Sequence, residues 1–466
     1  MKKVPYKQCL CSNCLNFQLK GDGLKARFIK GINRSPTQNI IRSLCDPSAV
    51  RIDSRLTFSF NKKEQLEQEV TAQFKLKSNV GKKNVTHVPA VSHGTFSLDD
   101  CARDCIYRDC LKCGKKKLMN YILDANPNLD LNRPANYHEW ELIVKKKPDG
   151  SVWKNAADGS TKKELVKIYH ATEIGVLLDK WCQNAVTMST HIFNFKWQAA
   201  QFELVKSKLK HGDLLMVMDF AQNVQHQETN EPIQKFRSRQ SSTLHPVVCY
   251  YKCHSCRSLI TDELLMATKD LTHDAAAVET FTQIAVENLM AKNITVNRII
   301  QFTDNCAVQY KCKTAFDYMS RWDIPIHRNY FGSQHGKGPA DGCIGRTVQQ
   351  VDSACRTGDA TIYDAFQFTF YCQENLTRDP TRIGKRLLEP HEIPMCEHFQ
   401  RHFIYVDSID RTLCTNAKPV PKTLKVHSAK NTGRPGIVEV NFATCFCRLI
   451  CVLNYYVNRF YYVSHV

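Results

Sequence analysis

The second half of the chain alternates short apolar runs with amphipathic segments. Residues 214–218 all carry large apolar side chains, the pattern of a strand buried on both faces. Segments 244–251 and 259–268 are rich in β-branched and aromatic residues and are joined by a Cys-His-Ser-Cys turn, which predicts a hairpin. Residues 275–292 repeat apolar side chains at helical spacing behind Asp274, a residue type that caps helices.

The same rhythm continues and indicates a fold class. Segment 296–302 predicts a fourth strand, 308–322 a helix, 324–331 a fifth strand and 342–355 a further helix. The order over 211–376 is strand, strand, strand, helix, strand, helix, strand, helix, which is the order that an RNase H-like sheet needs. We therefore expect an α/β fold with a mixed sheet flanked by helices, in which the first and fourth strands are neighbours roughly 5 Å apart.

The first half of the chain has a different character. Residues 1–120 are polar, basic and rich in clustered cysteines, and we interpret them as a zinc-supported accessory module. Residues 121–210 are predicted to be mainly helical, with a hairpin turn at 147–153, because apolar side chains recur there at helical spacing. These side chains include Leu165, Ile168, Ile174, Leu177, Leu178, Trp181, Phe193, Trp197, Phe202, Val205 and Leu209. Residues 377–466 are interpreted as a basic C-terminal extension with its own cysteine cluster.

Composition narrows the range of partners. The chain has 466 residues and a formal net charge of +19, so two or three domains are expected and a polyanion is the favoured partner. The first residues lack the apolar core of a secretory signal, and the sequence has no apolar stretch long enough to span a membrane. We expect a nuclear protein that binds DNA in a salt-dependent way and has no membrane-embedded part.

The chain has 22 cysteines, and their clustering favours metal binding over disulfides. One quartet has the spacing Cys-x3-Cys-x4-Cys-x2-Cys, and four thiolates so close in sequence can enclose Zn²⁺ in a tetrahedron. The quartet is Cys101, Cys105, Cys110 and Cys113. Further candidate zinc ligands near the start of the chain are Cys9, Cys11 and Cys14, with Cys45 as the candidate fourth.

Two other cysteine pairs are incomplete as zinc sites. Cys253 and Cys256 stand at the tip of the predicted hairpin, and Cys445 and Cys447 stand near the end of the chain. Two ligands alone cannot complete a zinc site. Each pair therefore needs a distant partner to hold zinc, or is simply structural.

Three acidic residues stand where strand ends and a helix start are predicted. Asp219 directly follows the first predicted strand, Asp304 comes two residues after the end of the fourth, and Asp341 directly precedes the last predicted helix. Carboxylate oxygens suit Mg²⁺ or Mn²⁺, and two such cations roughly 4 Å apart stabilise both the attacking and the leaving oxygen of a phosphodiester. We predict a catalytic metal site at these three acids, with Asp352 as the fallback for the third ligand.

Residues near these acids are candidates for contact with nucleic acid. His335 and Lys337 lie among glycines, which would let the backbone approach a phosphate while a cation meets it. An ordinary glycine-rich turn is the alternative interpretation of this loop. Asn305, Gln309 and Lys311 are candidates for orienting the strand, although each could equally cap or decorate the helix that begins there.

Several of these segments resemble one protein family. The motifs are Met-Asp-Phe-Ala-Gln-Asn at 218–223, Leu-His-Pro-Val-Val at 244–248, Gln-Phe-Thr-Asp-Asn at 301–305 with Gln-Tyr-Lys at 309–311, and Phe-Gly-Ser-Gln-His-Gly-Lys-Gly-Pro-Ala-Asp-Gly at 331–342. They resemble a family of uncharacterised, transposon-derived proteins with many copies in invertebrate and some vertebrate genomes. The resemblance covers residues 95–447 or thereabouts.

The resemblance implies a DDE-type transposase domain of RNase H-like fold, preceded by cysteine clusters. The catalytic acids of such a domain would be Asp219, Asp304 and Asp341. Two features depart from the pattern, because the third acid is Asp where many DDE enzymes use Glu, and the residues after Cys447 match nothing expected of the family.

The predicted function is therefore that of a mobile-element transposase or integrase that cleaves phosphodiesters in DNA and transfers the strands. Asp219 and Asp304 would bridge two Mg²⁺ ions, Asp341 would complete the second site, and water and later a freed 3′-hydroxyl would attack in line. Two alternatives stay open, namely a domesticated, catalytically inactive DNA-binding protein and a metal-dependent nuclease that cuts without joining. A homo-oligomeric assembly stays open as well.

Overall fold

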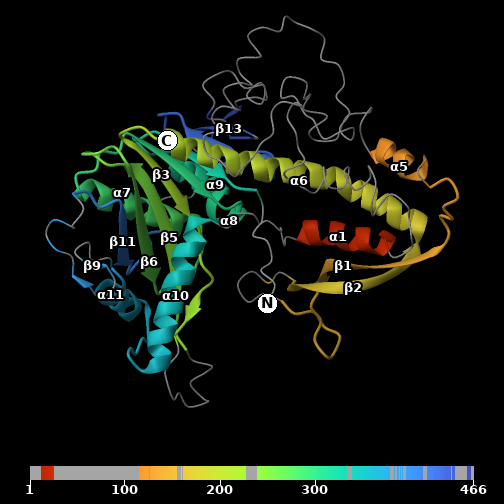
Figure 1. Cartoon of the computed structure of the whole chain (residues 1–466), viewed down its shortest axis with the longest axis horizontal. Helices are drawn as coiled ribbons and strands as arrows, with labels where there is room; N and C mark the ends of the chain where they lie inside the picture. The colour runs from red at the N-terminus through yellow and green to blue at the C-terminus, as the bar shows by residue number, and fades with distance from the viewer. Residues whose placement is uncertain are drawn as a thin grey trace, which may run out of the picture. The chain divides into compact units, whose positions relative to one another are not determined.

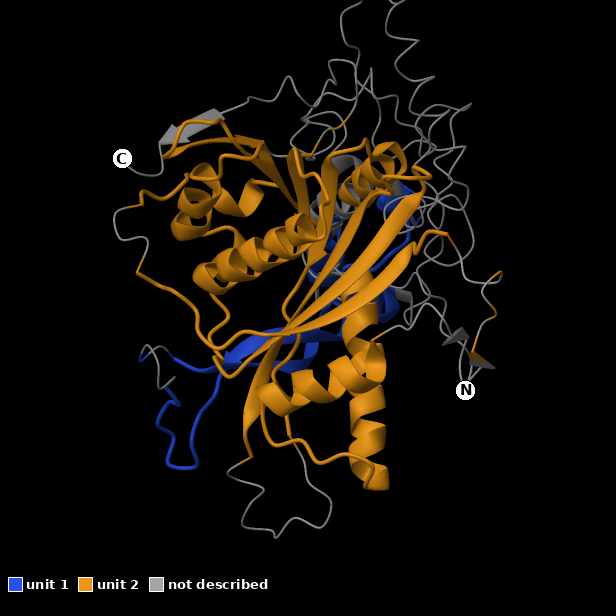
Figure 2. Cartoon of the chain, turned by 90° about the vertical axis from the view of Figure 1, so that its left-hand side faces the viewer, with its two compact units in different colours: residues 1–196 blue, residues 197–466 orange. Residues whose placement is uncertain are grey.

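The computed structural model divides into two compact units, residues 1–196 and 197–466 (Figure 2). The boundary falls inside one long helix, α6 (Ile174–Lys208). The structure describes residues 12–25, 115–124, 126–154, 159, 161–226, 239–332, 338–377, 382–383, 386–387, 389, 391, 395–412, 417–441, 443–444, 446 and 459–462.

Several predicted ligands cannot be placed in this structure. The candidate zinc ligands Cys9, Cys11, Cys45, Cys101, Cys105, Cys110 and Cys113, the cysteines Cys445 and Cys447, and the loop residues His335 and Lys337 all lie outside the described residues. Cys14 lies on helix α1 (Ser12–Lys25), but its side chain is likewise outside the description. The amino-terminal zinc module therefore stays a prediction.

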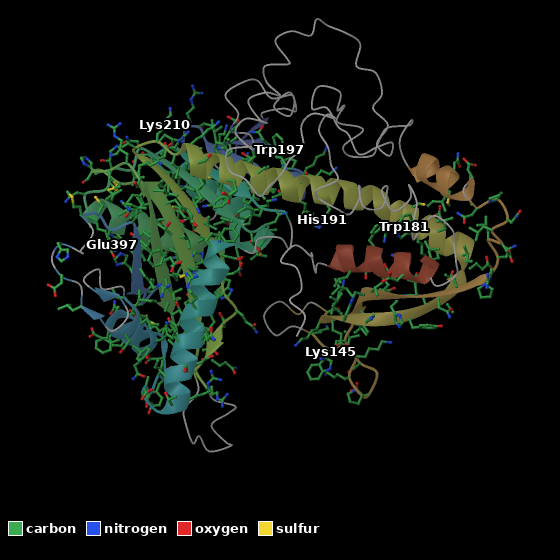
Figure 3. The ribbon with its side chains drawn as sticks, in the orientation of Figure 1. Lys145, Trp181, His191, Trp197, Lys210 and Glu397 are labelled. Carbon is green, nitrogen blue, oxygen red and sulfur yellow. The ribbon has the colours of Figure 1, made fainter. Side chains whose placement is uncertain are left out.

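Unit 1 contains a β-hairpin with helices packed against it. Strands β1 (Pro134–Val144) and β2 (Lys163–Glu173) pair antiparallel along their full length. The helices are α1, α5 (Lys115–Asp124) and the first part of α6. Phe17 of α1 stacks on Trp181 of α6 with ring centroids 4.9 Å apart, and both rings belong to one buried cluster. Figure 3 labels Trp181 on α6.

The prediction of a mainly helical segment over 121–210 is wrong for the hairpin strands. Burial along β2 alternates residue by residue, with Ile168 half-buried and Leu165 49% exposed. Leu165 and Ile168 stand three residues apart and so also fit a helical period, but the β-branched and aromatic side chains of this segment favour a strand. The predicted turn at 147–153 is confirmed, because Lys147 O accepts from Gly150 N over 2.9 Å and Gly150 adopts a φ of +82°.

Unit 2 contains one mixed sheet with the strand order β11-β6-β5-β3-β7-β8-β12-β13-β14, and β4 pairs with β5 beside this path. The strands are β3 (Asp213–Met218), β4 (Val224–Gln225), β5 (Ser241–Lys252), β6 (Leu259–Thr268), β7 (Arg298–Thr303), β8 (Ile326–Tyr330), β11 (Phe399–Tyr405), β12 (Ser428–Asn431), β13 (Ile437–Asn441) and β14 (Arg459–Tyr462). Strands β3, β7 and β8 are mutually parallel, whereas β5 is antiparallel to both β3 and β6. The prediction that the first and fourth strands are neighbours is confirmed, because β3 pairs with β7.

Helices cover both faces of this sheet (Figure 1). On one face, α7 (Ala275–Ala291) packs against Leu214, Met216 and Met218 of β3. On the other face, Leu215 and Val217 pack with the last turns of α6 and with α10 (Pro339–Thr357), and α11 (Ala365–Leu376) covers the sheet beside α10. Strand β3 is therefore buried on both sides, as its uninterrupted apolar sequence indicates.

One predicted helix is divided in two. The segment 308–322 forms α8 (Ala307–Tyr310) and α9 (Lys313–Ser320). Cys312 has an extended backbone between them, and its Sγ accepts a hydrogen bond from the N–H of Ala315 over 3.4 Å. A capping interaction of this kind begins a new helix and so ends the preceding one at Lys311.

Residues 377–466 do not form a separate extension. Strand β11 adds to the sheet in parallel with β6, and β12 continues it beyond β8, followed by β13 and β14. The predicted boundary at 376 thus falls inside unit 2. Smaller elements of the same region are β9 (Arg382–Ile383), β10 (Arg386–Leu387) and the 3-10 helix η3 (Thr423–Lys425). Among the helices that the structure describes, none is long and apolar enough to cross a membrane.

Candidate functional site

Two of the predicted acids stand side by side at the carboxyl ends of two adjacent strands of the sheet. Strand β3 ends at Met218 and β7 ends at Thr303, and these two residues are register partners in parallel neighbouring strands. Asp219 and Asp304 each follow the last residue of their strand, so they leave the sheet at the same level. Neighbouring strands lie roughly 4.8 Å apart, which is close enough for two carboxylates to share a cation.

A backbone N–H group holds one oxygen of each carboxylate, and the other oxygen has no hydrogen bond from the described residues. Asp219 Oδ1 accepts a hydrogen bond from the N–H of Phe220, and Asp304 Oδ1 accepts one from the N–H of Cys306, both over 2.8 Å. In the part of the chain that the structure describes, no donor reaches Oδ2 of either residue and neither residue forms an ion pair. Each half-buried carboxylate therefore presents one oxygen without a donor from these residues.

The third acid approaches from a helix. Asp341 lies in the first turn of α10, which begins with Pro339, and its Oδ2 accepts a hydrogen bond from the N–H of Gly338 over 2.9 Å. This contact caps the helix and fixes the side chain near the start of α10. Asp341 is exposed, and it is near enough to the strand ends for its charge to act on Asp219.

Burial and neighbouring negative charge raise the proton affinity of Asp219. Burial raises the pKa of Asp219 to about 7, and the negative charges of Asp304 and then Asp341 contribute to the rise. Burial also raises the pKa of Asp304, although the Cys306 N–H and the charge of Lys311 oppose this. Like charges gathered in a half-buried place are unfavourable unless a proton or a cation compensates them. The arrangement thus has the electrostatics of a divalent-cation site.

Lys311 takes a different place from the one predicted. Its side chain is 1% exposed, and its ammonium lies 4.6 Å from the ring centroid of Tyr330. No hydrogen-bond acceptor among the described residues meets Nζ. Burial lowers the pKa of Lys311 to about 7, while Asp304 acts in the opposite direction. The prediction that Lys311 orients a nucleic-acid strand directly has no support in this conformation, because its ammonium lies inside the protein, where its charge lowers the pKa of Asp304.

An open cleft with a volume of about 860 Å³ begins at the two strand-end acids. It is lined by Asp219, Phe220, Ala221, Gln222, Asn223, Val224, Gln225, Ser241, His273, Asp304, Cys306, Gln309, Val348 and Asp352. Gln309, predicted to orient the strand, thus borders this space, and Asn305 is half-buried next to Asp304. Asp352 also faces the cleft, about three helical turns along α10 from Asp341.

The cleft contains a histidine that the sequence did not reveal. His273 stacks on Phe220 with ring centroids 4.4 Å apart, and its Nε2 lies 2.7 Å from Asn223 Oδ1. Burial lowers its pKa, so the ring is neutral near pH 7. His273 comes just before the helix-capping Asp274, far along the chain from Asp219, and no spacing in the sequence relates the two residues.

A comparison with protein-family models assigns most of unit 2 to a known family. Residues 198–440, just over half of the chain, match the model described as Domain of unknown function (DUF8701). The chain belongs to this family. The DUF8701 domain thus extends from α6 to β13 and contains all three acids, Lys311, His273 and the cleft. Neither the curated proteins nor the solved structures yield a match to the chain.

Proposed function

We propose that this protein is a DDE-type transposase or integrase with an RNase H-like core, which cleaves phosphodiesters in DNA with the help of a divalent cation and transfers the strands. The observation that carries the proposal is the pair Asp219 and Asp304 at the ends of adjacent parallel strands, each with one oxygen free of described donors. The strand order β6-β5-β3-β7-β8, with α7 before β7, α9 before β8 and α10 after it, supports the proposed core.

The donor set fits Mg²⁺ or Mn²⁺. Oxygen ligands from Asp219, Asp304 and Asp341 suit these hard cations, and the raised pKa of Asp219 reflects the concentration of negative charge that such a cation would neutralise. When bound, the cation would stabilise the charge that develops on the attacking and leaving oxygens of the phosphodiester.

Residues of the chain itself would hold the nucleic acid beside the acids. Gln309 and the exposed Gln222 offer amide N–H groups to phosphate oxygens along the cleft. Neutral His273, stacked on Phe220, gives the cleft an aromatic wall that adds no further negative charge. The net charge of +19 supports DNA as the polyanion, and it also favours the nucleus as the compartment.

Cleavage of supercoiled plasmid DNA by the full chain, in Mg²⁺ or Mn²⁺, tests this proposal. Asp219→Asn, Asp304→Asn and Asp341→Asn should each slow nicking by at least about 100-fold, since loss of a direct ligand should cost as much as the largest losses seen for outer-shell partners. DNA binding should persist or tighten in these variants, because a negative charge near phosphate is removed. Asp352→Asn should have little effect.

Asp323→Asn is the matched control. Asp323 is exposed just before β8, at the opposite end of the strand from the acids, so the same chemical change there should leave nicking unchanged. Nicking that survives in Asp304→Asn would contradict the proposed mechanism. A wild-type chain that binds DNA but never cuts it in either metal would favour the domesticated DNA-binding protein, and cutting without strand joining would favour the nuclease.

A further inference from the structure

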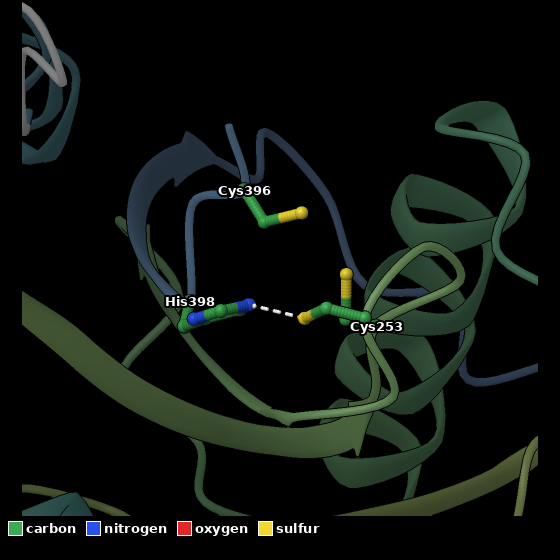
Figure 4. A group of neighbouring side chains, drawn as sticks. Cys253, Cys396 and His398 are labelled. Atoms are coloured by element: carbon green, nitrogen blue, oxygen red, sulfur yellow. Dashed lines mark hydrogen bonds between the residues drawn. The ribbon is translucent and has the colours of Figure 1, made fainter. Parts of the chain in front are cut away.

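A second group of ligand-type side chains gathers at the far tip of the β5–β6 hairpin. Cys253 and Cys256 belong to the turn between these strands, and Cys396 and His398 directly precede β11. The three Sγ atoms and a ring nitrogen of His398 all lie within 4.8 Å of one another. Figure 4 shows Cys253, Cys396 and His398 directed toward a common centre. The two halves of the group are thus separated in sequence and adjacent in space.

The backbone fixes both halves independently of the side chains. In the turn, Cys253 O accepts from Arg257 N over 3.0 Å, Cys253 N donates to Ser258 O over 2.8 Å, and Arg257 adopts a φ of +59°. On the other side, His398 O accepts from Thr261 N over 2.9 Å, where β11 begins to pair with β6. Each ligand pair is therefore supported by main-chain hydrogen bonds.

The side-chain chemistry is that of a zinc site. All three cysteines are free thiols, and His398 Nε2 lies 2.9 Å from Cys256 Sγ. Three thiolates and one imidazole form a tetrahedral ligand set for Zn²⁺, in which Zn–S bonds of about 2.3 Å place neighbouring sulfur atoms about 3.8 Å apart. The observed limit of 4.8 Å requires only a small contraction to reach that geometry.

We propose that Cys253, Cys256, Cys396 and His398 bind one structural Zn²⁺ that fastens the start of β11 to the β5–β6 turn. Four protein ligands fill the tetrahedron, so no position stays open for a substrate, which is the mark of a structural site. The site is independent of the acidic cleft and of the proposed DNA chemistry.

The position of β11 explains what the zinc would do. β11 is the terminal strand of the described sheet order and pairs in parallel with β6, a strand far earlier in the sequence. It contributes buried Phe403 to the core, and its Arg401 pairs with Glu263 of β6 over 3.0 Å. A metal at the point where β11 begins would hold the two strands in register, in addition to these contacts.

Zinc content of the reduced full chain provides the first test. Cys396→Ala combined with His398→Ala should remove one zinc per chain relative to the wild-type protein, whatever the other cysteines bind. Cys355→Ala is the control, because this half-buried cysteine of α10 lies outside the group, and it should leave the zinc content unchanged. Equal zinc content in the double variant and the wild-type protein would overturn the proposal.

A second variant keeps four ligands, so this test does not require the protein to fold without the metal. His398→Cys should retain the zinc of the wild-type protein while changing the ligand set from three sulfurs and one nitrogen to four sulfurs. After replacement of zinc by Co²⁺, the visible d–d bands and the thiolate-to-cobalt charge-transfer band should differ between His398→Cys and the wild-type chain. Identical cobalt spectra for the two chains would show that His398 is not a ligand and would overturn the proposal.

Discussion

His245 shows at the scale of a single residue how burial sets the charge of the core. The side chain is fully buried on β5, it stacks on Phe281 with ring centroids 4.6 Å apart, and it forms a T-shaped contact with Phe220. Burial lowers the pKa of His245 from 6.5 to about 3, and the nearby His273 adds to the effect. The folded protein therefore keeps this ring neutral at pH values where the unfolded chain would protonate it.

This difference predicts acid destabilisation that depends on His245. Because the pKa is lower in the folded state, the contribution to stability is complete above pH 6.5 and is lost as the pH falls from 6.5 to about 3. Each pH unit in this window should cost about 1.4 kcal/mol for one such group. In His245→Phe, denaturant unfolding at a series of pH values should show a slope reduced by that amount.

The control for this measurement is His211→Phe, which alters an exposed imidazole just before β3. Replacement of this exposed ring should change the unfolding free energy by no more than about 0.5 kcal/mol. Some dependence of the unfolding free energy on pH should remain in every variant, because burial also places the pKa of His327 well below its usual value. The same slope in His245→Phe and the wild-type protein would contradict the assignment of a neutral, buried ring.

At the scale of elements, one side chain fastens α6 to the sheet of unit 2. Gln198 is 1% exposed, and its Nε2 donates to the carbonyl oxygens of Tyr330 and His427 over 2.8 and 2.9 Å. Its Oε1 accepts from the N–H of Thr444 over 3.2 Å. The helix is thereby joined to the end of β8 and to the residues before β12 and after β13.

Gln198→Leu should therefore destabilise unit 2 by roughly 2–4 kcal/mol, because it removes the hydrogen bonds that this buried side chain makes with backbone groups of Tyr330, His427 and Thr444. Chemical denaturation monitored by circular dichroism measures the change. Gln350→Leu, the same substitution at an exposed position of α10, should change the unfolding free energy by no more than about 0.5 kcal/mol. Similar stabilities of the two variants would show that Gln198 does not anchor the helix.

Elements whose signal lies in their own sequence could be predicted, and elements defined by distant partners could not. The apolar run of β3, the hairpin of β5 and β6 and the capped helix α7 follow from local patterns, and all three form as expected. Strand β2 cannot be told from a helix by its apolar residues, because their spacing also fits a helical period. The addition of β11 to the edge of β6 depends on pairing between distant segments, which no local pattern encodes.

The candidate site divides in the same way. Asp219 and Asp304 could be identified because each ends an apolar strand, and the strand order then makes them neighbours. The burial of Lys311 could not be predicted from the sequence, because it depends on how the chain turns between α8 and α9. Only half of the proposed zinc ligands, Cys253 and Cys256, can be found from the sequence, since Cys256 and His398 are 142 residues apart. A cysteine pair in a sequence predicts that partners are needed, but not where they are.

At the scale of the whole molecule, the charge of the chain and the charge of the cleft are opposed. The net charge of +19 attracts a polyanion over long distances, whereas the cleft presents Asp219, Asp304 and Asp352. A phosphate that enters the cleft would meet repulsion unless a cation neutralises the acids. Divalent-cation binding at the strand ends is therefore the condition for the proposed reaction on DNA.

Binding of Mn²⁺ to the full chain, followed by the electron paramagnetic resonance signal of the free ion, measures this condition most directly. Mn²⁺ prefers oxygen ligands and so reports on the acids rather than on thiolate sites. The wild-type protein and Asp323→Asn should bind Mn²⁺ with the same affinity, and excess Mg²⁺ should displace it. Asp219→Asn and Asp304→Asn should each weaken binding by at least about 10-fold. Equal Mn²⁺ affinity in all four chains would contradict the account, because the paired strand-end carboxylates would then hold no cation.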